Sequence, residues 1–271
     1  MDLVRGWVPL RNRDSHKGDY GRVHILSGCV GYTGAPYFAS EAAVRSGSGL
    51  VYLHVPQEIW PILAVKCRET MVFPLSEASL LEKLSKADAV LIGPGLGRDP
   101  LRDSRTRQLA RELQNPLVLD ADGINAFSGH IDVLKARKGR LTILTPHEGE
   151  FSRLLGCSLG DLDRAAAAEG FARESGCIVV LKGHRTISAF PDGALYVNTT
   201  GNPGMAKGGS GDVLSGMILS LLGQGMSAEQ AVPAAVWLHG RAGDLCASRL
   251  GEYGMTPSDL LQAIPEAFQL K

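Results

Sequence analysis

The chain has 271 residues, of which 44% are hydrophobic and 21% are charged, as in ordinary globular proteins. Its 28 Lys and Arg residues balance 28 Asp and Glu residues, so the overall charge does not point to a nucleic-acid or membrane partner. The five cysteines never show CxxC spacing, which argues against a disulfide framework or a zinc site and favours a reducing cytoplasm. We expect neither an export signal nor a membrane-spanning helix, because no apolar run is long enough.

Short apolar runs alternate along the chain with segments of helical length. The runs are almost continuously apolar, which is typical of parallel strands covered on both faces. We expect strands at residues 23–27, 50–55, 89–92, 117–120, 141–144 and 178–182. We expect helices at residues 35–46, 75–86, 101–113, 148–155 and 160–174. This alternation predicts an open, mostly parallel α/β sheet.

The pattern changes after residue 182. Residues 186–190 and 194–198 flank Pro191, Asp192 and Gly193, and this arrangement predicts a β-hairpin. Helices are expected to follow at residues 212–222, 228–249 and 257–268. Because the chain has no low-complexity linker, internal repeat or charge block, we expect one domain over residues 1–271.

Unusual sequences follow five of the predicted strands. Ligands of open α/β sheets bind beyond the carboxyl ends of the strands. In this chain those ends run into GCVGYTGAP, GPGLGR, DADGIN, TPHEGE and KGHRT. Parallel strands end at the same edge of a sheet, so we expect these five loops to form one binding rim.

The segment GMAKGGSGD at residues 204–212 precedes an apolar helical pattern. Its glycines let the backbone approach a ligand closely. The helix that follows offers unpaired N–H groups and a positive dipole end, a combination that suits phosphate. Asp212 is either a base beside the bound anion or a cap of the helix, and its residue type leaves both open. We expect the dipole to keep Asp212 ionised.

Polar residues in the other loops also have two interpretations. Asp120, Asp122 and Asn125 could bind a hydrated magnesium ion or sugar hydroxyls, or they could form turns and caps. Lys182 and Arg185 could bind phosphate, Arg185 in a bidentate manner, or they could be solvated.

Two familiar cofactor motifs are absent or incomplete. GPGLGR lacks the second spacing of a dinucleotide fingerprint, and Pro94 removes a backbone donor. The chain contains no GxxxxGK[ST] sequence. Hydride transfer on a Rossmann fold and a P-loop nucleotide site are therefore disfavoured.

The segment TPHEGE predicts a helix start. HEGEF lacks the second histidine of the HExxH metal motif. Thr145 is expected to cap the helix, with Pro146 at its first position and Glu148 three residues after the cap. This interpretation leaves His147 and Glu150 without a structural role.

Seven strings in this chain resemble, in the same order, the ADP/ATP-dependent NAD(P)H-hydrate dehydratases. The resemblance covers residues 15–240, in the strings SHKGDYGRVHILSG, YTGAPYFASEAAVRSGSGLVYL, GPGLGR, VLDADGINAF, LTPHEGEF, VLKGH and GNPGMAKGGSGDVLSGMI. It implies a ribokinase-like fold, a three-layer α/β/α sandwich around a mostly parallel sheet. Proteins of that family repair hydrated NADH and NADPH. The nucleotide phosphorylates the 6-hydroxyl of the damaged nicotinamide ring, and phosphate then leaves.

The resemblance also implies roles for residues. Asp212 corresponds to the catalytic base that takes the proton of the 6-hydroxyl. The anion hole corresponds to Gly209, Ser210 and Gly211, of which Gly211 also contacts AMP. The nucleotide segment corresponds to Lys182, Gly183, His184, Arg185 and Thr186. The side that binds hydrated nicotinamide corresponds to Ala35, Gly95, His147, Asn202 and Asp212.

Glu150 falls where kinases of this fold keep the glutamate of an NxxE element that organises Mg²⁺. His147 replaces the asparagine of that element, which favours a dehydratase over a vitamin-precursor kinase. Ser210 stands where threonine is common, and we expect little effect because both residues carry a hydroxyl. A small-molecule kinase and a non-enzymatic nucleotide sensor remain the alternatives.

The resemblance implies partners as well. We expect the chain to bind hydrated NADH or NADPH together with ADP or ATP, with ADP as the favoured donor. We expect activity on the S epimer alone, because the chain lacks the epimerase domain often fused to this one. We expect a cytoplasmic homo-oligomer, a tetramer.

Overall fold

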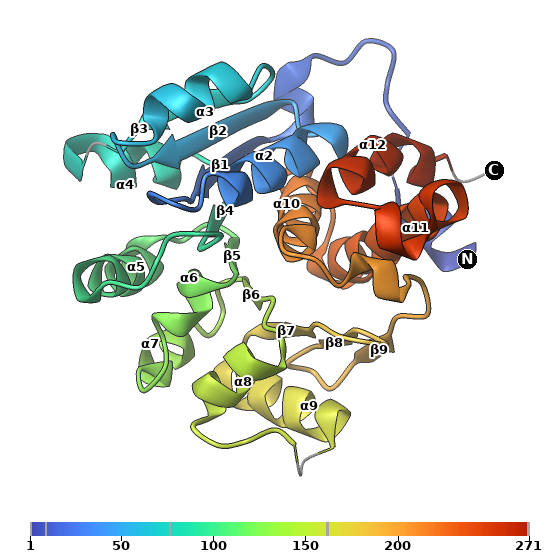
Figure 1. Cartoon of the computed structure of the whole chain (residues 1–271). Coiled ribbons are helices and arrows are strands. Elements are labelled where there is room, and N and C mark those ends of the chain that lie inside the picture. The colour runs from blue at the N-terminus through green and yellow to red at the C-terminus, as the bar shows by residue number, and fades with distance from the viewer. Residues whose placement is uncertain (1, 9, 76, 161–162, 270–271) are drawn as a thin grey trace.

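The computed structural model describes residues 2–8, 10–75, 77–160 and 163–269. Within these residues, one sheet of nine strands has the order β3-β2-β1-β4-β5-β6-β7-β8-β9 (Figure 1). All neighbours from β3 to β7 are parallel, and β8 and β9 are antiparallel to their neighbours. The strands are β1 (Arg22–Leu26), β2 (Leu50–Val55), β3 (Met71–Pro74), β4 (Ala89–Ile92), β5 (Leu117–Leu119), β6 (Thr142–Leu144), β7 (Ile178–Leu181), β8 (Ile187–Ala189) and β9 (Leu195–Val197). The predicted mostly parallel α/β sheet and its terminal hairpin are confirmed.

Helices cover both faces of the sheet (Figure 1). One layer consists of α1 (Asp2–Trp7), α2 (Gly34–Arg45), α3 (Trp60–Lys66), α10 (Ser210–Gly223), α11 (Ala228–Gly254) and α12 (Pro257–Ala267). The other layer consists of α4 (Glu77–Ser85), α5 (Pro100–Glu112), α6 (Asp122–Asn125), α7 (Ile131–Lys135), α8 (Glu148–Leu155) and α9 (Arg164–Ser175). Along β4, Leu91 faces the first layer, whereas Val90 and Ile92 face the second. Coverage on both faces explains why the strands are continuously apolar.

Several elements differ from the sequence-based expectation. The edge strand β3 was not predicted, because it has only four residues, none of them buried, and ends at a proline. The short helices α1, α3, α6 and α7 were also not predicted. The predicted helices 75–86 and 160–174 include positions 76, 161 and 162, which lie outside the described residues.

Helix α10 packs against α2 almost backbone to backbone. A Cβ added to Gly216 would lie 2.1 Å from the carbonyl oxygen of Ala39. Twelve residues of α10 are buried, including Val213, Met217 and Leu221. The close packing and the burial fix the position of α10, and with it the position of its N-terminus. Among the described residues, no helix has the length and apolar character needed to cross a membrane.

Two buried histidines pair on neighbouring strands. His24 Nδ1 on β1 lies 3.0 Å from His54 Nε2 on β2. The rings stack on each other, and Tyr52 stacks on His24. Burial lowers the pKa of His24 to about 3 and the pKa of His54 to about 4. Both rings are therefore neutral in the folded protein at any pH near neutrality.

This pair is expected to make the fold acid-sensitive. Between pH 4 and 6.5 the unfolded chain binds more protons at these positions than the folded chain, so stability falls as the pH is lowered. The free energy of unfolding should drop by about 2 kcal/mol per histidine between pH 7 and pH 5. Urea unfolding at a series of pH values would measure this drop in the free energy of unfolding. In the double variant His24→Gln/His54→Gln the slope should flatten, and an unchanged slope would contradict this explanation.

Candidate active site

The loops at the carboxyl edge of the sheet are joined by backbone hydrogen bonds. Gly28 N, after β1, donates to Pro94 O, after β4, at 2.9 Å. Lys182 N, after β7, donates to Pro146 O, after β6, at 2.8 Å. The expected rim of strand-end loops is therefore present.

Helix α10 begins at this rim, two residues earlier than expected. Its N-cap is Gly209, which has a φ of +105°. A side chain there would also collide, because an added Cβ would lie 2.8 Å from the Phe38 ring. Asp212 is the third residue of the helix, so the interpretation of Asp212 as its cap is wrong. Its carboxylate belongs to the first helical turn, next to the unpaired N–H groups.

A charged cluster lies against this helix end. Lys182 Nζ is 2.8 Å from Asp120 Oδ1 and 3.9 Å from Glu150 Oε2. A Cβ on Gly211 would lie 3.3 Å from the same ammonium. Asp120 is only 1% exposed and Glu150 only 5%. Lys182 is thus paired within the site and is not a solvated residue, and Asp120 serves as its direct partner.

The cluster has more carboxylates than cations, and this affects Asp212. Burial raises the pKa of Asp212 to about 7, helped by Asp120 and Glu150 and opposed by Lys182. The expectation that the helix dipole keeps Asp212 fully ionised is therefore wrong. Burial alone would lower the pKa of Lys182, but Asp120 and Glu150 raise it above its ordinary value. Lys182 stays protonated, and Asp212 is balanced between its two protonation states near neutral pH.

Asp122 and Asn125 serve the local structure of α6 and its neighbours. Gly97 N donates to Asp122 Oδ2 at 2.8 Å, and Asn125 Nδ2 donates to Asp122 Oδ1 at 3.3 Å. Arg153 Nε donates to Asn125 Oδ1 at 2.9 Å. These bonds favour the turn interpretation of both residues over magnesium binding.

His147 and Glu150 form the capping box of α8. His147 N donates to Glu150 Oε2 at 2.9 Å, and Gly149 N donates to His147 Nδ1 at 3.0 Å. The predicted cap at Thr145 is wrong, because the Thr145 hydroxyl donates to Leu119 O at 3.3 Å instead. The chain remains bonded to its neighbouring strands until Pro146, which delays the helix start. His147 Nε2 is 3.3 Å from Glu150 Oε1, and the ring is half-exposed at the rim.

The structure brings together Ala35 and Gly95, two of the residues assigned to the nicotinamide side. A Cβ on Gly95 would lie 2.9 Å from the Ala35 Cβ, so only glycine fits there. Asn202 is engaged at both ends of its amide. Its Oδ1 accepts from Gly204 N at 3.0 Å, and its Nδ2 donates to Asp244 Oδ1 at 3.0 Å. Asn202 therefore shapes the loop that leads into α10.

Residues 182–186 form the turn between β7 and β8, and residues 183–185 are exposed. Arg164, on α9, donates to His184 O at 3.0 Å and to Lys182 O at 3.2 Å. The backbone of Arg185 adopts a left-handed conformation with a φ of +56°. The turn is therefore fixed through its backbone, while the side chains of His184 and Arg185 remain exposed.

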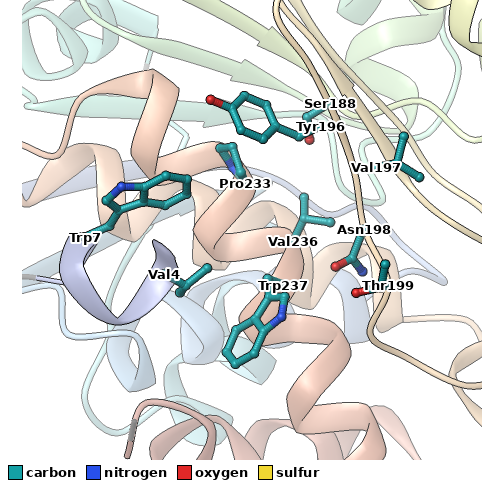
Figure 2. Close-up of a pocket in the computed structure, with 10 residues that line it drawn as sticks. All are labelled: Val4, Trp7, Ser188, Tyr196, Val197, Asn198, Thr199, Pro233, Val236 and Trp237. Carbon is teal, nitrogen blue, oxygen red and sulfur yellow. The ribbon is translucent and has the colours of Figure 1, made fainter. Parts of the chain in front are cut away.

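A cavity of about 190 Å³ is lined by residues of α1, α11 and the β8–β9 hairpin with the residues that follow it (Figure 2). Asn198, at its edge, donates from its backbone N to Thr186 O at 2.9 Å. The aromatic residues that line the cavity are Trp7, Tyr196 and Trp237, and the polar ones are Ser188, Asn198 and Thr199. The sequence-based analysis missed this cavity, because its walls come from α1, the hairpin and α11, and no local motif connects them.

His239 is the second feature that the sequence did not reveal. Its Nε2 lies 2.9 Å from Ser210 O, at the start of α10. Across the described ranges, no three His, Cys, Asp or Glu side chains are arranged to hold a metal ion.

A mostly parallel sheet whose strand ends surround a glycine-capped helix N-terminus, with a carboxylate in its first turn, is typical of phosphate-binding α/β proteins. The family model described as NAD(P)H-hydrate dehydratase matches residues 23–266. The chain therefore belongs to the NAD(P)H-hydrate dehydratase family.

Relatives and solved structures agree with this membership. The bifunctional NAD(P)H-hydrate repair enzyme of Moorella thermoacetica is 43% identical over 96% of this chain and 52% of that protein. The ADP-dependent (S)-NAD(P)H-hydrate dehydratase of Neisseria meningitidis is 38% identical over 89% of this chain and 82% of that protein. The chain spans about half the length of the bifunctional relatives that it matches.

Two crystal structures share the fold over nearly the whole chain. A ribokinase-like protein of Enterococcus faecalis is 31% identical with a TM-score of 0.87, covering 99% of this chain and 93% of its own. The ADP/ATP-dependent NAD(P)H-hydrate dehydratase of Bacillus subtilis, co-crystallised with ATP and Mg²⁺, is 31% identical with a TM-score of 0.84. The match covers 99% of this chain and 96% of that one. The predicted ribokinase-like fold is confirmed.

The pairing of Lys182 with Asp120 can be tested by stability. Lys182→Met leaves a buried carboxylate without its cation and should lower the free energy of unfolding by about 3 kcal/mol. Asp120→Asn added to Lys182→Met should recover much of that loss. Chemical denaturation of the wild type, Lys182→Met and the double variant would measure the free energy of unfolding of each. A Lys182→Met variant as stable as the wild type, or a double variant no better than the single one, would argue against this pairing.

Proposed function

We propose that the chain is an ADP-dependent (S)-NAD(P)H-hydrate dehydratase. The observation that carries the proposal is Asp212 in the first turn of α10, with the Lys182 ammonium beside Gly211. A carboxylate next to an anion-binding helix end suits phosphoryl transfer to a hydroxyl, which needs a proton acceptor and neutralised charge. The name of the Neisseria meningitidis relative supports the same reaction.

The proposed reaction has two steps. The 6-hydroxyl oxygen of the hydrated nicotinamide attacks the terminal phosphorus of the nucleotide, the bond to the remaining nucleotide breaks, and Asp212 takes the hydroxyl proton. The ring nitrogen then expels phosphate from C6, and loss of a proton from the neighbouring carbon restores the double bond. Gly209, Ser210 and Gly211 would surround the transferred group. The pKa of Asp212, at about 7, suits a general base that works near neutral pH.

Both substrates have candidate places at the rim. The nucleotide would lie along residues 182–186, with its base in the aromatic cavity (Figure 2), whose lining residue Asn198 is hydrogen-bonded to Thr186. Cavities lined mainly by hydrophobic and aromatic side chains, with a few polar groups, suit such rings. The hydrated nicotinamide would lie against Ala35, Gly95 and His147, on the other side of the N-terminus of α10.

Mg²⁺ would neutralise charge on the phosphates. The ion usually takes one or two carboxylates together with substrate phosphates, and therefore needs no preformed cage of side chains. Asp120, Glu150 and Asp212 together exceed the single charge of Lys182, so the donor set fits a cation bound with the nucleotide. Glu150 is the residue that we propose to hold it. ADP as the favoured donor and a homotetramer follow from the family resemblance. A cytoplasmic location follows from the cysteine pattern and completes the proposal.

An absorbance assay tests the proposal. Acid-hydrated NADH would be mixed with the protein, Mg²⁺ and either ADP or ATP, and the return of dihydronicotinamide absorbance followed. Recovery that depends on nucleotide is the expected result, and the two donors are compared directly. Accumulation of a phosphorylated product without recovery would instead indicate a small-molecule kinase. Nucleotide binding without any turnover would indicate a sensor.

Asp212→Asn is the variant that tests the general base of this reaction most directly. It keeps the shape of the side chain but removes the base, so turnover should fall by about 1,000-fold. Thermal unfolding should stay at or above the wild-type temperature, because a buried carboxylate beside Asp120 is removed. Activity like that of the wild type in a folded Asp212→Asn protein would remove Asp212 from the mechanism.

A further inference from the structure

His239 contacts the start of α10 from α11. Its Nε2 is 2.9 Å from Ser210 O, and a carbonyl oxygen can only accept, so Nε2 carries the proton. Burial lowers the pKa of His239 to about 4, opposed by the hydrogen bond to Ser210 and helped by the nearby charge of Lys182. The ring is therefore neutral near pH 7, with its tautomer fixed by this bond.

The contact controls the orientation of a neighbouring N–H group. Ser210 C=O and Gly211 N–H belong to one planar peptide unit and point in opposite directions. Ser210 is the first residue of α10, so its carbonyl also belongs to the helical ladder, and the His239 donor is a second contact that restricts this peptide and the direction of its N–H. The first intrahelical bond of α10 runs from Val213 N to Gly209 O at 3.1 Å, so the Gly211 N–H precedes the helical ladder. Ser210 N already donates to Lys207 O at 3.2 Å, which leaves Gly211 as a principal donor toward a bound anion.

Helix α11 is held in register on both sides of His239. Thr200 Oγ1 donates to Trp237 O at 2.9 Å. A Cβ added to Gly240 would lie 2.2 Å from the same Thr200 hydroxyl, so the backbones approach closely there. These two contacts keep the imidazole at one height relative to the N-terminus of α10.

We propose that His239 is a positioning residue for phosphoryl transfer, which aims the Gly211 N–H at the transferred phosphoryl group by donating from Nε2 to Ser210 O. The inference rests on the proposed function and adds a residue to it. Preorganised donors stabilise developing charge only when their direction is fixed before the reaction. The effect should therefore appear in the transition state more than in the binding of the nucleotide.

A matched pair of variants separates the donor from the packing. His239→Gln keeps an N–H close to the position of Nε2, whereas His239→Met has similar length and no donor. His239→Met should lower kcat by about 30-fold with little change in KM for ADP, less than the loss of a whole anion-hole donor. His239→Gln should recover most of that kcat. Equal kcat in His239→Met and the wild type, or a His239→Gln protein as impaired as His239→Met, would overturn the proposal.

A binding experiment tests the positioning role of His239 independently of the repair reaction. Calorimetry would compare the binding of AMP with Mg²⁺ alone and with added aluminium fluoride, which then takes the place of the phosphoryl group that ADP transfers. The three proteins should bind AMP alike, and the gain from aluminium fluoride should shrink by about tenfold in His239→Met only. If the wild type shows this gain but repairs no hydrated NADH, the proposed function fails while the role of His239 stands. Weakened AMP binding in both variants, with lowered unfolding temperatures, would leave His239 a structural role only and overturn the proposal.

Discussion

The buried ammonium of Lys182 connects three strand ends to the N-terminus of α10. Its partner Asp120 follows β5, Glu150 belongs to the helix after β6, and Gly211 lies in the first turn of α10. Removing this charge would leave buried carboxylates facing one another, so the geometry of the rim depends on it. Burial raises the pKa of Asp212, and the excess of carboxylates over Lys182 adds to this shift. The same excess makes the site receptive to a cation that accompanies the nucleotide. The geometry of the rim and the proposed chemistry thus both depend on the single positive charge of Lys182 among several buried carboxylates.

Rigid packing turns this charged cluster into a defined geometry. Gly216 allows α10 to approach the backbone of α2, and Gly209 lets the chain turn into the helix beneath Phe38. His239, on α11, donates to the carbonyl of Ser210, the first residue of α10. A helix end fixed in this way can present N–H groups to a phosphoryl group without reorganising during the reaction.

The sequence predicted the sheet well because its parallel strands are buried on both faces and read as continuous apolar runs. It missed β3, whose residues are too few and too exposed for that pattern. The strand-end loops marked the rim, yet pairing within it depends on residues such as Lys182 and Asp120, 62 positions apart. The capping box of α8 was assigned two residues too early, because Thr145 offered an equally good local pattern. Contacts such as that of His239 with Ser210 have no local signature at all.

The protonation of Asp212 tests the electrostatic account most directly. Nuclear magnetic resonance of the protein with ¹³C-labelled aspartate carboxyls would follow the titration, and the spectrum of Asp212→Asn would assign its signal. The account predicts a midpoint near pH 7 for the ligand-free protein. A midpoint near the ordinary aspartate value of 3.8 would contradict it, since Lys182 and the helix dipole would then outweigh burial and the neighbouring carboxylates.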